Sequence, residues 1–434
     1  MNAVSPGAVS VGIDLGTTGC RAVAIDGSGD LQAHAEAPVP APLCRQNQIT
    51  QDPEQWWQAV VTCLRSLSQQ VAPERVDAIA VDGTSGTLLL CDSLGVPVTP
   101  ALLYNDSRAQ AQAAQIAGTA VPESGGHGAS GSLAKLLWLQ EQKRDREAAH
   151  ALHQADWIAG RLTGRWGHSD DNNCLKLGYD AAARRWPDWF ARLGVNTALL
   201  PAVHAPGTTL GAVSPQLAAD LGLSADTRVV AGTTDGVAAF LAAGASRSGH
   251  GVTSLGSTLV LKLLSDGPIF SPEHGVYSHR LGNYWLAGGA SNSGGAVLLQ
   301  HFDIGQMEAM TPLLDPEHLT GLDYYPLPAV GERFPVNDPD RVARLEPRPE
   351  DSVRFFQAML EGIARIEAQG YRLLAEMGAP KVSKVRTTGG GANNAAWTRI
   401  REKILGIPLV PARSGMAAYG TALLAQGVVE KNFS

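Results

Sequence analysis

The sequence predicts an α/β fold made of two related halves, and three observations support this prediction. Short apolar strands alternate with helical segments up to about residue 240, an order typical of α/β domains. A motif that joins two apolar strands through Leu-Gly-hydroxyl-Thr occurs twice, at 15–18 and at 255–258. Finally, a chain of 434 residues is too long for one ordinary core, so two domains are expected.

The first of these motifs is a predicted β-hairpin whose turn carries phosphate-binding groups. Residues 9–19 read Val-Ser-Val-Gly-Ile-Asp-Leu-Gly-Thr-Thr-Gly, and a second apolar strand follows over 22–26. Glycines let backbone N–H groups approach an anion, and the threonine hydroxyls add donors. Asp14 would repel a phosphate unless a divalent cation lay between them, so it indicates bound magnesium. Taken alone, the motif is also compatible with an ordinary hairpin that has a polar turn.

The second motif repeats the strand, the turn and the strand over 252–261. Ser254 stands where the first copy has Asp14. We therefore expect two related halves that present phosphate-binding hairpins to a shared cleft, with the metal held by the first half alone.

Between the two hairpins, the loop at 82–86 and Tyr104 are candidate parts of a site. Asp52 and Pro53 open a predicted helix, and the strand over 76–81 then leads into Asp82-Gly83-Thr84-Ser85-Gly86. The hydroxyl and carboxylate groups of that loop suit hydrogen bonding to a polyol. Tyr104 is a candidate apolar wall for the carbon face of a sugar, or an ordinary partly buried tyrosine.

Asp235 follows a predicted strand in Gly-Thr-Thr-Asp-Gly, at the point where an apolar helix begins. Because α/β folds place their sites at the carboxyl ends of strands, this carboxylate suits a general base that takes a proton from an alcohol. Capping of the following helix is an equally good interpretation of the residue alone.

Three successive glycines mark the last strand-to-loop transition of the chain, over 385–393. They leave a flat backbone surface against which a nucleoside can lie, although a flexible turn is the alternative. The strand before the glycines and the helix from about Asn394 favour the nucleoside site.

Composition excludes several classes of function. A net charge of −7 without basic clusters argues against nucleic acid as the main partner. The five cysteines are odd in number and at least 19 positions apart, which predicts neither zinc nor a disulfide framework but reduced thiols. No apolar run approaches the ~18 residues of a membrane span, and the first strand begins too early for a targeting peptide. These observations predict a cytoplasmic enzyme without a membrane partner.

Residues 130–142, Ser-Gly-Ser-Leu-Ala-Lys-Leu-Leu-Trp-Leu-Gln-Glu-Gln, resemble the first signature of the FGGY carbohydrate kinases. The family's other landmarks also appear in order, as the two hairpin turns, Gly232–Asp235 and Gly389–Asn393. The resemblance implies two ribonuclease-H-like (actin-type ATPase) domains that flank a central nucleotide/sugar cleft. It places them at 1–243, with the sugar and magnesium sites, and at 244–434, with the ATP site. The last helix, about 415–434, is expected to pack back on the first domain.

The resemblance also implies roles for individual residues, with ATP and magnesium as cofactors. Asp235 is the implied base that deprotonates a terminal sugar hydroxyl, and Asp14 the implied magnesium ligand, through water. The implied contacts with the sugar and the transferring phosphate are Asp14, Thr18, Gly19, Cys20, Arg21, Asp82, Ser85 and Asp235. The implied contacts with ATP are Gly16, Thr17, Gly256, Ser257, Thr258, Gly295, Gly389, Gly390, Gly391, Ala392 and Asn393.

Departures from the family pattern narrow the acceptor. Glycerol kinases of this family carry Arg-Glu where this chain has Ser85-Gly86, which disfavours glycerol. Residues 81–87, 175–179 and 321–328 resemble the compact D-ribulose kinases, in which Asp14, Ser85 and Asp235 are expected to contact the ketopentose. D-ribulose is therefore the first acceptor we expect, with D-xylulose or another pentulose or pentitol as the alternative. A monomer or weak dimer is expected. An actin-like ATPase or sugar sensor without phosphoryl transfer is the alternative of another class.

Overall fold

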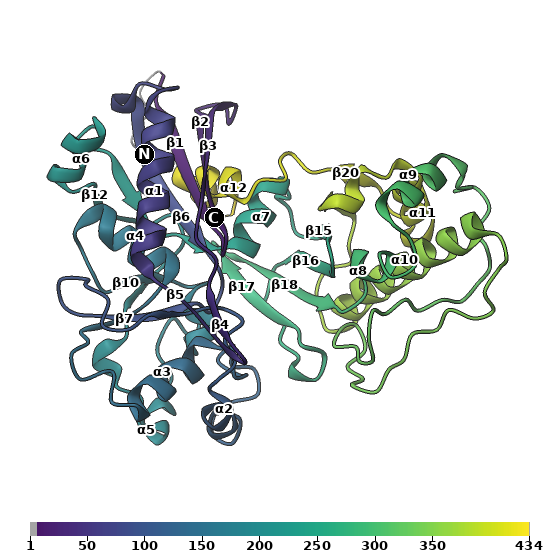
Figure 1. The fold of residues 1–434 in the computed structure, drawn as a ribbon, viewed down its shortest axis with the longest axis horizontal. Helices are drawn as coiled ribbons and strands as arrows, with labels where there is room; N and C mark the ends of the chain where they lie inside the picture. The colour runs from purple at the N-terminus through teal and green to yellow at the C-terminus, as the bar shows by residue number, and fades with distance from the viewer. Residues whose placement is uncertain (1–6, 434) are drawn as a thin grey trace. The chain divides into compact units, whose positions relative to one another are not determined.

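The computed structural model describes residues 7–433, and the chain divides into two compact units (Figure 1). The first unit comprises Met1–Ala242, His279–Gly282 and Met416–Ser434. The second unit comprises Ala243–Ser278 and Asn283–Gly415.

The first unit is built on a mixed central sheet with the strand order β12-β13-β6-β1-β2-β3. β1 pairs antiparallel with β2, as the first hairpin motif predicts, and parallel with β6 on its other side. A short strand, β14, also pairs with β6. The bounds are β1 (Val9–Leu15), β2 (Gly19–Asp26), β3 (Leu31–Pro38), β6 (Val76–Gly83), β12 (Thr209–Ala212), β13 (Arg228–Val230) and β14 (Thr233–Thr234).

Helices cover both faces of this sheet. α1 (Pro53–Ser68) begins as predicted, with the Asp52 side chain accepting a hydrogen bond from the Glu54 backbone N–H. It packs in one apolar cluster with α4 (Gln154–Thr163) and with Val11 and Ile13 of β1. Because side chains alternate along a strand, Gly12 faces the opposite side. There α12 (Ala417–Ala425) lies so close that a Cβ on Gly12 would stand 2.1 Å from the Ala418 carbonyl oxygen.

A second, smaller sheet of the first unit follows the order β4-β5-β8-β7-β9. Its strands are β4 (Leu43–Arg45), β5 (Gln48–Gln51), β7 (Leu88–Cys91), β8 (Ala101–Leu102) and β9 (His150–His153). The remaining helices and strands of this unit are α2 (Gln110–Ala117), α3 (Ser132–Glu141), β10 (His168–Asp170), α5 (Phe190–Leu193), β11 (Ala202–His204), α6 (Pro215–Leu221), α7 (Asp235–Ala243) and α13 (Val428–Asn432).

The second unit repeats the central arrangement of the first, because β15 pairs antiparallel with β16 and parallel with β19. Its sheet runs β18-β16-β15-β19-β20, and the long helix α10 (Ser352–Glu376) packs beside α11 (Ala395–Leu405). Residues 321–350 form an irregular segment that contains isolated β-bridges, among them Tyr325 with Arg344. The other bounds are β15 (His250–Leu255), β16 (Leu259–Ser265), β17 (Tyr277–Leu281), β18 (Tyr284–Ser291), α8 (Gly295–Leu298), α9 (Ile304–Met310), β19 (Lys384–Thr388) and β20 (Leu409–Pro411).

Two expectations from composition can be compared with the structure. No helix within residues 7–433 is long and apolar enough to cross a membrane. The five cysteines are free thiols, of which four are buried and Cys44 is exposed.

Candidate active site

Two buried carboxylates lie side by side in the central sheet of the first unit. β1 and β6 run parallel, and their register places Asp14 opposite Asp82. Asp14 is 8% exposed and Asp82 is fully buried. Burial raises the pKa of Asp14, while a hydrogen bond with Asp82 and the charge of Arg21 offset part of the rise. Burial, and then the charge of Asp14, raises the pKa of Asp82 well above its ordinary value.

A third carboxylate, Asp235, follows directly after β14, which pairs with β6. β14 pairs with β6 so that Thr233 lies opposite Asp82, and α7 begins two residues later at Asp235. The charge of Asp235 contributes to the raised pKa of Asp82. Asp235 also accepts a hydrogen bond from the backbone N–H of Gly236 through Oδ1, at 2.7 Å. Three acids from three strand ends are thus brought together. Each was a candidate from the sequence, and the strand register adds the pairing of Asp14 with Asp82.

The polar loop after β6 is held by side chains from other segments of the chain, none of which was a candidate site residue. Gln154 Oε1 accepts from the Thr84 backbone N–H at 3.0 Å and from the Thr84 hydroxyl at 2.9 Å. Lys135 Nζ donates to the Gly86 carbonyl at 2.7 Å, and Lys176 Nζ donates to the Ser85 carbonyl at 3.2 Å. On the other face of the sheet, the Thr421 hydroxyl of α12 donates to Asp82 Oδ2. One signal was available for Lys135, which stands in an otherwise apolar run of α3.

Several buried polar atoms around this loop have no hydrogen-bond partner within the described part of the chain. Buried polar groups in native proteins are normally satisfied, so such a cluster indicates a place where a polar ligand or water binds. Asn172 belongs here because its Nδ2 donates to the Thr233 hydroxyl at 3.0 Å. The atoms are Asp82 Oδ1, Ser85 Oγ, Gln154 Nε2 and Asn172 Oδ1.

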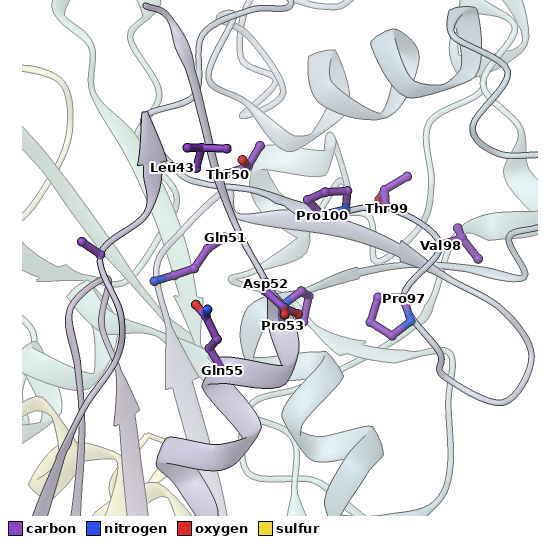
Figure 2. A pocket seen from close by; sticks show the side chains of 11 residues that line it. Leu43, Thr50, Gln51, Asp52, Pro53, Gln55, Pro97, Val98, Thr99 and Pro100 are labelled. Carbon is purple, nitrogen blue, oxygen red and sulfur yellow. The ribbon is translucent and has the colours of Figure 1, made fainter. Parts of the chain in front are cut away.

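A cavity of about 520 Å³ lies elsewhere in the first unit, between the β4–β5 hairpin, the start of α1 and Pro97–Pro100 (Figure 2). None of the predicted site residues lines it. Gln51, at its edge, donates through Nε2 to the carbonyls of Thr17 at 3.0 Å and Pro40 at 2.6 Å. Gln51 therefore links the lining of this cavity to the turn of the first hairpin, whereas the three carboxylates lie outside that lining.

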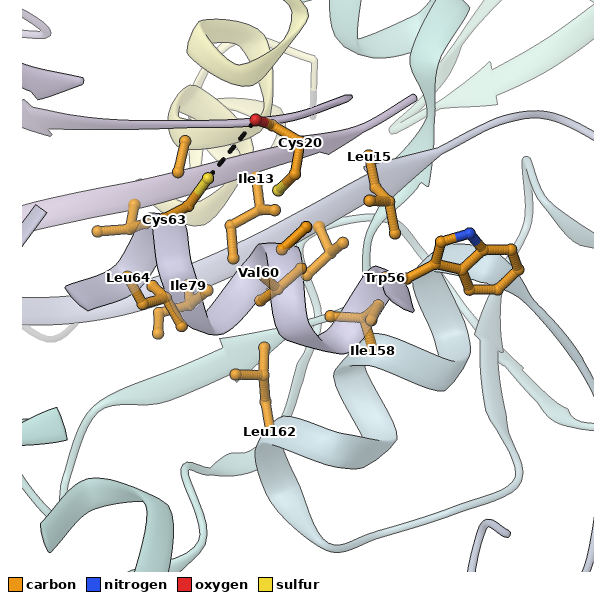
Figure 3. Packing of buried hydrophobic residues seen from close by; sticks show 14 of the residues in the cluster. Ile13, Leu15, Cys20, Trp56, Val60, Cys63, Leu64, Ile79, Ile158 and Leu162 are labelled. Carbon is orange, nitrogen blue, oxygen red and sulfur yellow. Dashed lines mark hydrogen bonds between the residues drawn. The ribbon is translucent and has the colours of Figure 1, made fainter. Parts of the chain in front are cut away.

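Of the residues predicted to contact a ligand at the first hairpin, Thr18 and Arg21 are exposed and Cys20 is buried. Gly16 N–H bonds to the Gly19 carbonyl at 2.9 Å, and Thr18 is exposed. Arg21, whose side chain is 51% exposed, lies 3.5 Å from both Asp14 and Glu36. Cys20 is one of the residues expected to contact the ligand, and its side chain is buried. That thiol is fully buried in the apolar cluster, beside Cys63 (Figure 3), because strand alternation turns it inward where Arg21 turns outward.

The second unit brings the predicted nucleotide-binding segments together. Gly295 N–H donates to the Gly256 carbonyl at 2.8 Å, and Ala296 N–H donates to the Ser257 carbonyl at 3.1 Å. Gly389 has φ +82°, and a Cβ there would stand 2.6 Å from the Leu255 carbonyl oxygen. The turn after β15, the start of α8 and the loop after β19 therefore form one cluster of backbone groups.

The outer part of this cluster is open. Gly389, Gly390 and Asn393 are exposed, and a Cβ on Gly390 would meet no atom within 4 Å. Thr258 completes the turn before β16, and Ala392 lies in the short 3₁₀ helix Gly390–Asn393. The exposed glycine backbone is the surface that the sequence analysis expected to lie against a nucleoside.

The donor set suits magnesium at Asp14, although the site is not a multidentate cage. Within residues 7–433, no three His, Cys, Asp or Glu side chains are grouped to hold a metal ion. Magnesium in phosphoryl-transfer sites keeps several waters and takes one or two carboxylates together with substrate phosphates. Asp14, with the unpartnered Asp82 Oδ1 beside it, provides hard oxygen ligands of that kind.

Comparison with known proteins gives consistent matches along the chain. Residues 9–242 match the N-terminal domain, and residues 251–426 the C-terminal domain, of the FGGY family of carbohydrate kinases. The xylulose kinase of Escherichia coli K12 is 28% identical over 96% of this chain and 89% of its own length. The gluconokinase of Bacillus subtilis 168 is 24% identical over 91% of this chain and 82% of its own length. The crystal structure of a xyloylose kinase from Brucella ovis superposes with a TM-score of 0.88 at 25% identity, covering 98% of this chain and 91% of that one.

Proposed function

Since the chain belongs to the FGGY family of carbohydrate kinases, we propose that it transfers the γ-phosphate of ATP to the terminal hydroxyl of a pentulose. Its fold is the two-domain α/β fold of those sugar kinases. The observation that carries the proposal is the convergence of Asp14, Asp82 and Asp235 beside buried polar atoms that lack partners. Such a set of donors and acceptors matches a polyhydroxy compound and a proton-transfer step.

In the proposed reaction, Asp235 accepts the proton of the terminal hydroxyl while that oxygen attacks the γ-phosphorus. The new P–O bond forms as the bond to the β-phosphate oxygen breaks, and ADP leaves. Catalysis of this kind depends on positioning and on charge stabilisation. Ser85, on the loop held by Lys176, is the proposed hydrogen-bond partner of the sugar, and the unpartnered Ser85 Oγ supports this role.

Asp14 is proposed to hold magnesium, through water, at the end of β1. When bound, the ion neutralises charge on the phosphate groups. Thr17 and Thr18 contribute donors of the adjacent turn, which Gly16 closes through its hydrogen bond to the Gly19 carbonyl. Arg21 adds a positive charge that pairs with Asp14.

ATP is proposed to bind to the second unit. The proposed phosphate-binding turn consists of Gly256, Ser257, Thr258 and Gly295. Backbone hydrogen bonds between the turn after β15 and the start of α8 hold these residues together. Gly389–Asn393 supply the exposed backbone surface for the nucleoside.

Two pentuloses are candidate acceptors. The curated relatives include xylulose kinases from several bacteria, which favours D-xylulose. Residues 81–87, 175–179 and 321–328 resemble D-ribulose kinases, and this makes D-ribulose the second candidate. The two sugars differ in the configuration of a single hydroxyl, so a direct comparison is needed.

The test is ADP release with magnesium and ATP in the presence of D-xylulose, D-ribulose, L-ribulose, xylitol, ribitol, gluconate or glycerol, with a control that lacks sugar. Stimulation by one pentulose alone supports the proposal and identifies the acceptor. Stimulation only by gluconate or glycerol contradicts the pentulose assignment. If ATP binds but no sugar stimulates its turnover, the chain is an ATPase or a sensor.

A further inference from the structure

Two lysines bind consecutive carbonyl groups of the polar loop after β6, and their surroundings differ. Lys135 on α3 donates to the carbonyls of Gly86 at 2.7 Å and Leu103 at 2.6 Å. Lys176, on the short 3₁₀ helix Cys174–Leu177, donates to the Ser85 carbonyl at 3.2 Å. The same loop is therefore held from two sides.

Lys135 has the properties of a structural residue. It is fully buried and binds two backbone carbonyls that lie on separate segments. Burial lowers the pKa of Lys135 to about 7, with the negative charge of Asp106 opposing the shift. Its contacts account for its place in the fold.

Lys176 differs from Lys135, because it binds the Ser85 carbonyl of the loop and also interacts with the charge of Asp235. Its side chain passes Gly86, where a Cβ would stand 3.0 Å from Lys176 Cδ. The negative charge of Asp235 stabilises the ammonium ion against the cost of its burial. An ammonium group has three N–H donors, and the Ser85 carbonyl accounts for one of them.

The segment that carries Lys176 is fixed, so the position of the ammonium group is well defined. Asp170 Oδ1 accepts from the backbone N–H groups of Asn172 at 2.8 Å and Asn173 at 3.0 Å, just before the 3₁₀ helix. Asn172 in turn bonds to Thr233, two residues before Asp235. The lysine and the proposed base thus belong to one hydrogen-bonded framework.

We propose that Lys176 is a specificity-determining residue, whose ammonium group donates a hydrogen bond to an oxygen of the pentulose close to the hydroxyl that Asp235 deprotonates. This inference rests on the proposed function. The buried Ser85 hydroxyl, which lacks a partner among residues 7–433, lies on the residue whose carbonyl anchors the lysine. A neutral, oxygen-rich ligand suits a site where one ammonium ion and the Asp235 carboxylate interact, because Asp235 would repel an anionic ligand.

The test uses Lys176→Met, Lys176→Arg and the matched control Lys135→Met in the full chain. Lys176→Met keeps most of the apolar stem against Gly86 and removes the charged donor. We expect its kcat/KM for the pentulose to fall roughly 10- to 100-fold, as loss of a charge-assisted hydrogen bond predicts. Lys176→Arg retains the charge and should recover part of the loss. Lys135→Met should instead lower the melting temperature.

The decisive measurement compares wild type and Lys176→Met on the pentulose and on its singly deoxygenated analogues. If Lys176 binds one sugar oxygen, the variant loses little further activity on the analogue that lacks this oxygen, and the two changes are not additive. An equal loss on every analogue, or no loss at all, overturns the inference, because a structural role moves all substrates together. If the wild-type protein phosphorylates no pentulose, the proposed function is overturned together with this inference. The wild-type assay alone separates that outcome from a failure of the Lys176 inference only.

Discussion

The two central sheets share one strand arrangement but carry different side chains at the same place. In the first unit, β1 pairs with β2 and β6, and its register sets Asp14 opposite Asp82. In the second unit, β15 pairs with β16 and β19 in the same directions, and the register sets Ser254 opposite Thr388. An acid pair in one unit thus corresponds to a hydroxyl pair in the other.

On this difference rests our proposal that one backbone framework serves two kinds of chemistry. Carboxylates suit the acceptor and metal side of a phosphoryl transfer, where a proton must be taken and a cation held. Hydroxyls and bare backbone suit a polyphosphate, which acids would repel. The loops after the paired strands follow the same division, since β6 leads into a polar loop held by lysines and β19 into exposed glycines.

The largest expected effect is that of Asp235→Asn, because Asp235 is the proposed base for the sugar hydroxyl. We expect kcat to fall by roughly 10²- to 10⁴-fold, the usual contribution of a general base. ATP binding, measured by calorimetry, should stay within about twofold of wild type. Substantial sugar phosphorylation by this variant would remove Asp235 from the role of base.

Replacing Asp14 by its counterpart in the second hairpin tests whether this carboxylate binds magnesium. Asp14→Ser installs the residue found in the second hairpin. We expect the rate to fall about 100-fold and the half-saturating magnesium concentration to rise about tenfold. The measurement is a magnesium titration of ADP release at saturating ATP and sugar. An unchanged titration curve would contradict the magnesium assignment of Asp14.

The reciprocal change, Ser254→Asp, introduces the acid into the second hairpin. Repulsion between this carboxylate and the ATP phosphates should raise the KM for ATP about tenfold, equivalent to ~1.4 kcal/mol. The KM for the sugar should change little. Because Ser254 is partly exposed, the variant should fold normally, and Ser254→Ala is the size control. If Ser254→Asp raises the sugar KM instead, the division of ligands between the units is wrong.

The sequence revealed the local part of this arrangement and missed the part that depends on pairing. Both hairpins were predictable because their turns lie within about ten residues of chain. The pairing of Asp14 with Asp82 depends on strand register across 68 positions of sequence, which no local pattern specifies. Lys176 lies in an irregular segment without periodicity, so only the folded chain places it beside Asp235. The burial of Cys20 could have been predicted from the sequence. Side chains alternate along β2, so Cys20 points to the face opposite that of the exposed Arg21.

The smallest effect is expected for a methyl group on the glycine surface of the second unit. Gly390→Ala adds a side chain where the free protein has open space, so stability should be unchanged. A nucleoside that lies on this backbone would be displaced, and the KM for ATP should rise about fivefold, equivalent to ~1 kcal/mol. Gly267→Ala, also in open space, is the control and should leave the KM for ATP unchanged. Gly389→Ala should instead destabilise the unit, because its φ of +82° and the Leu255 carbonyl at 2.6 Å leave no place for a Cβ. Equal KM values for Gly390→Ala and wild type would mean that the nucleoside does not touch this surface, and the acid–hydroxyl contrast between the hairpins would then need another explanation.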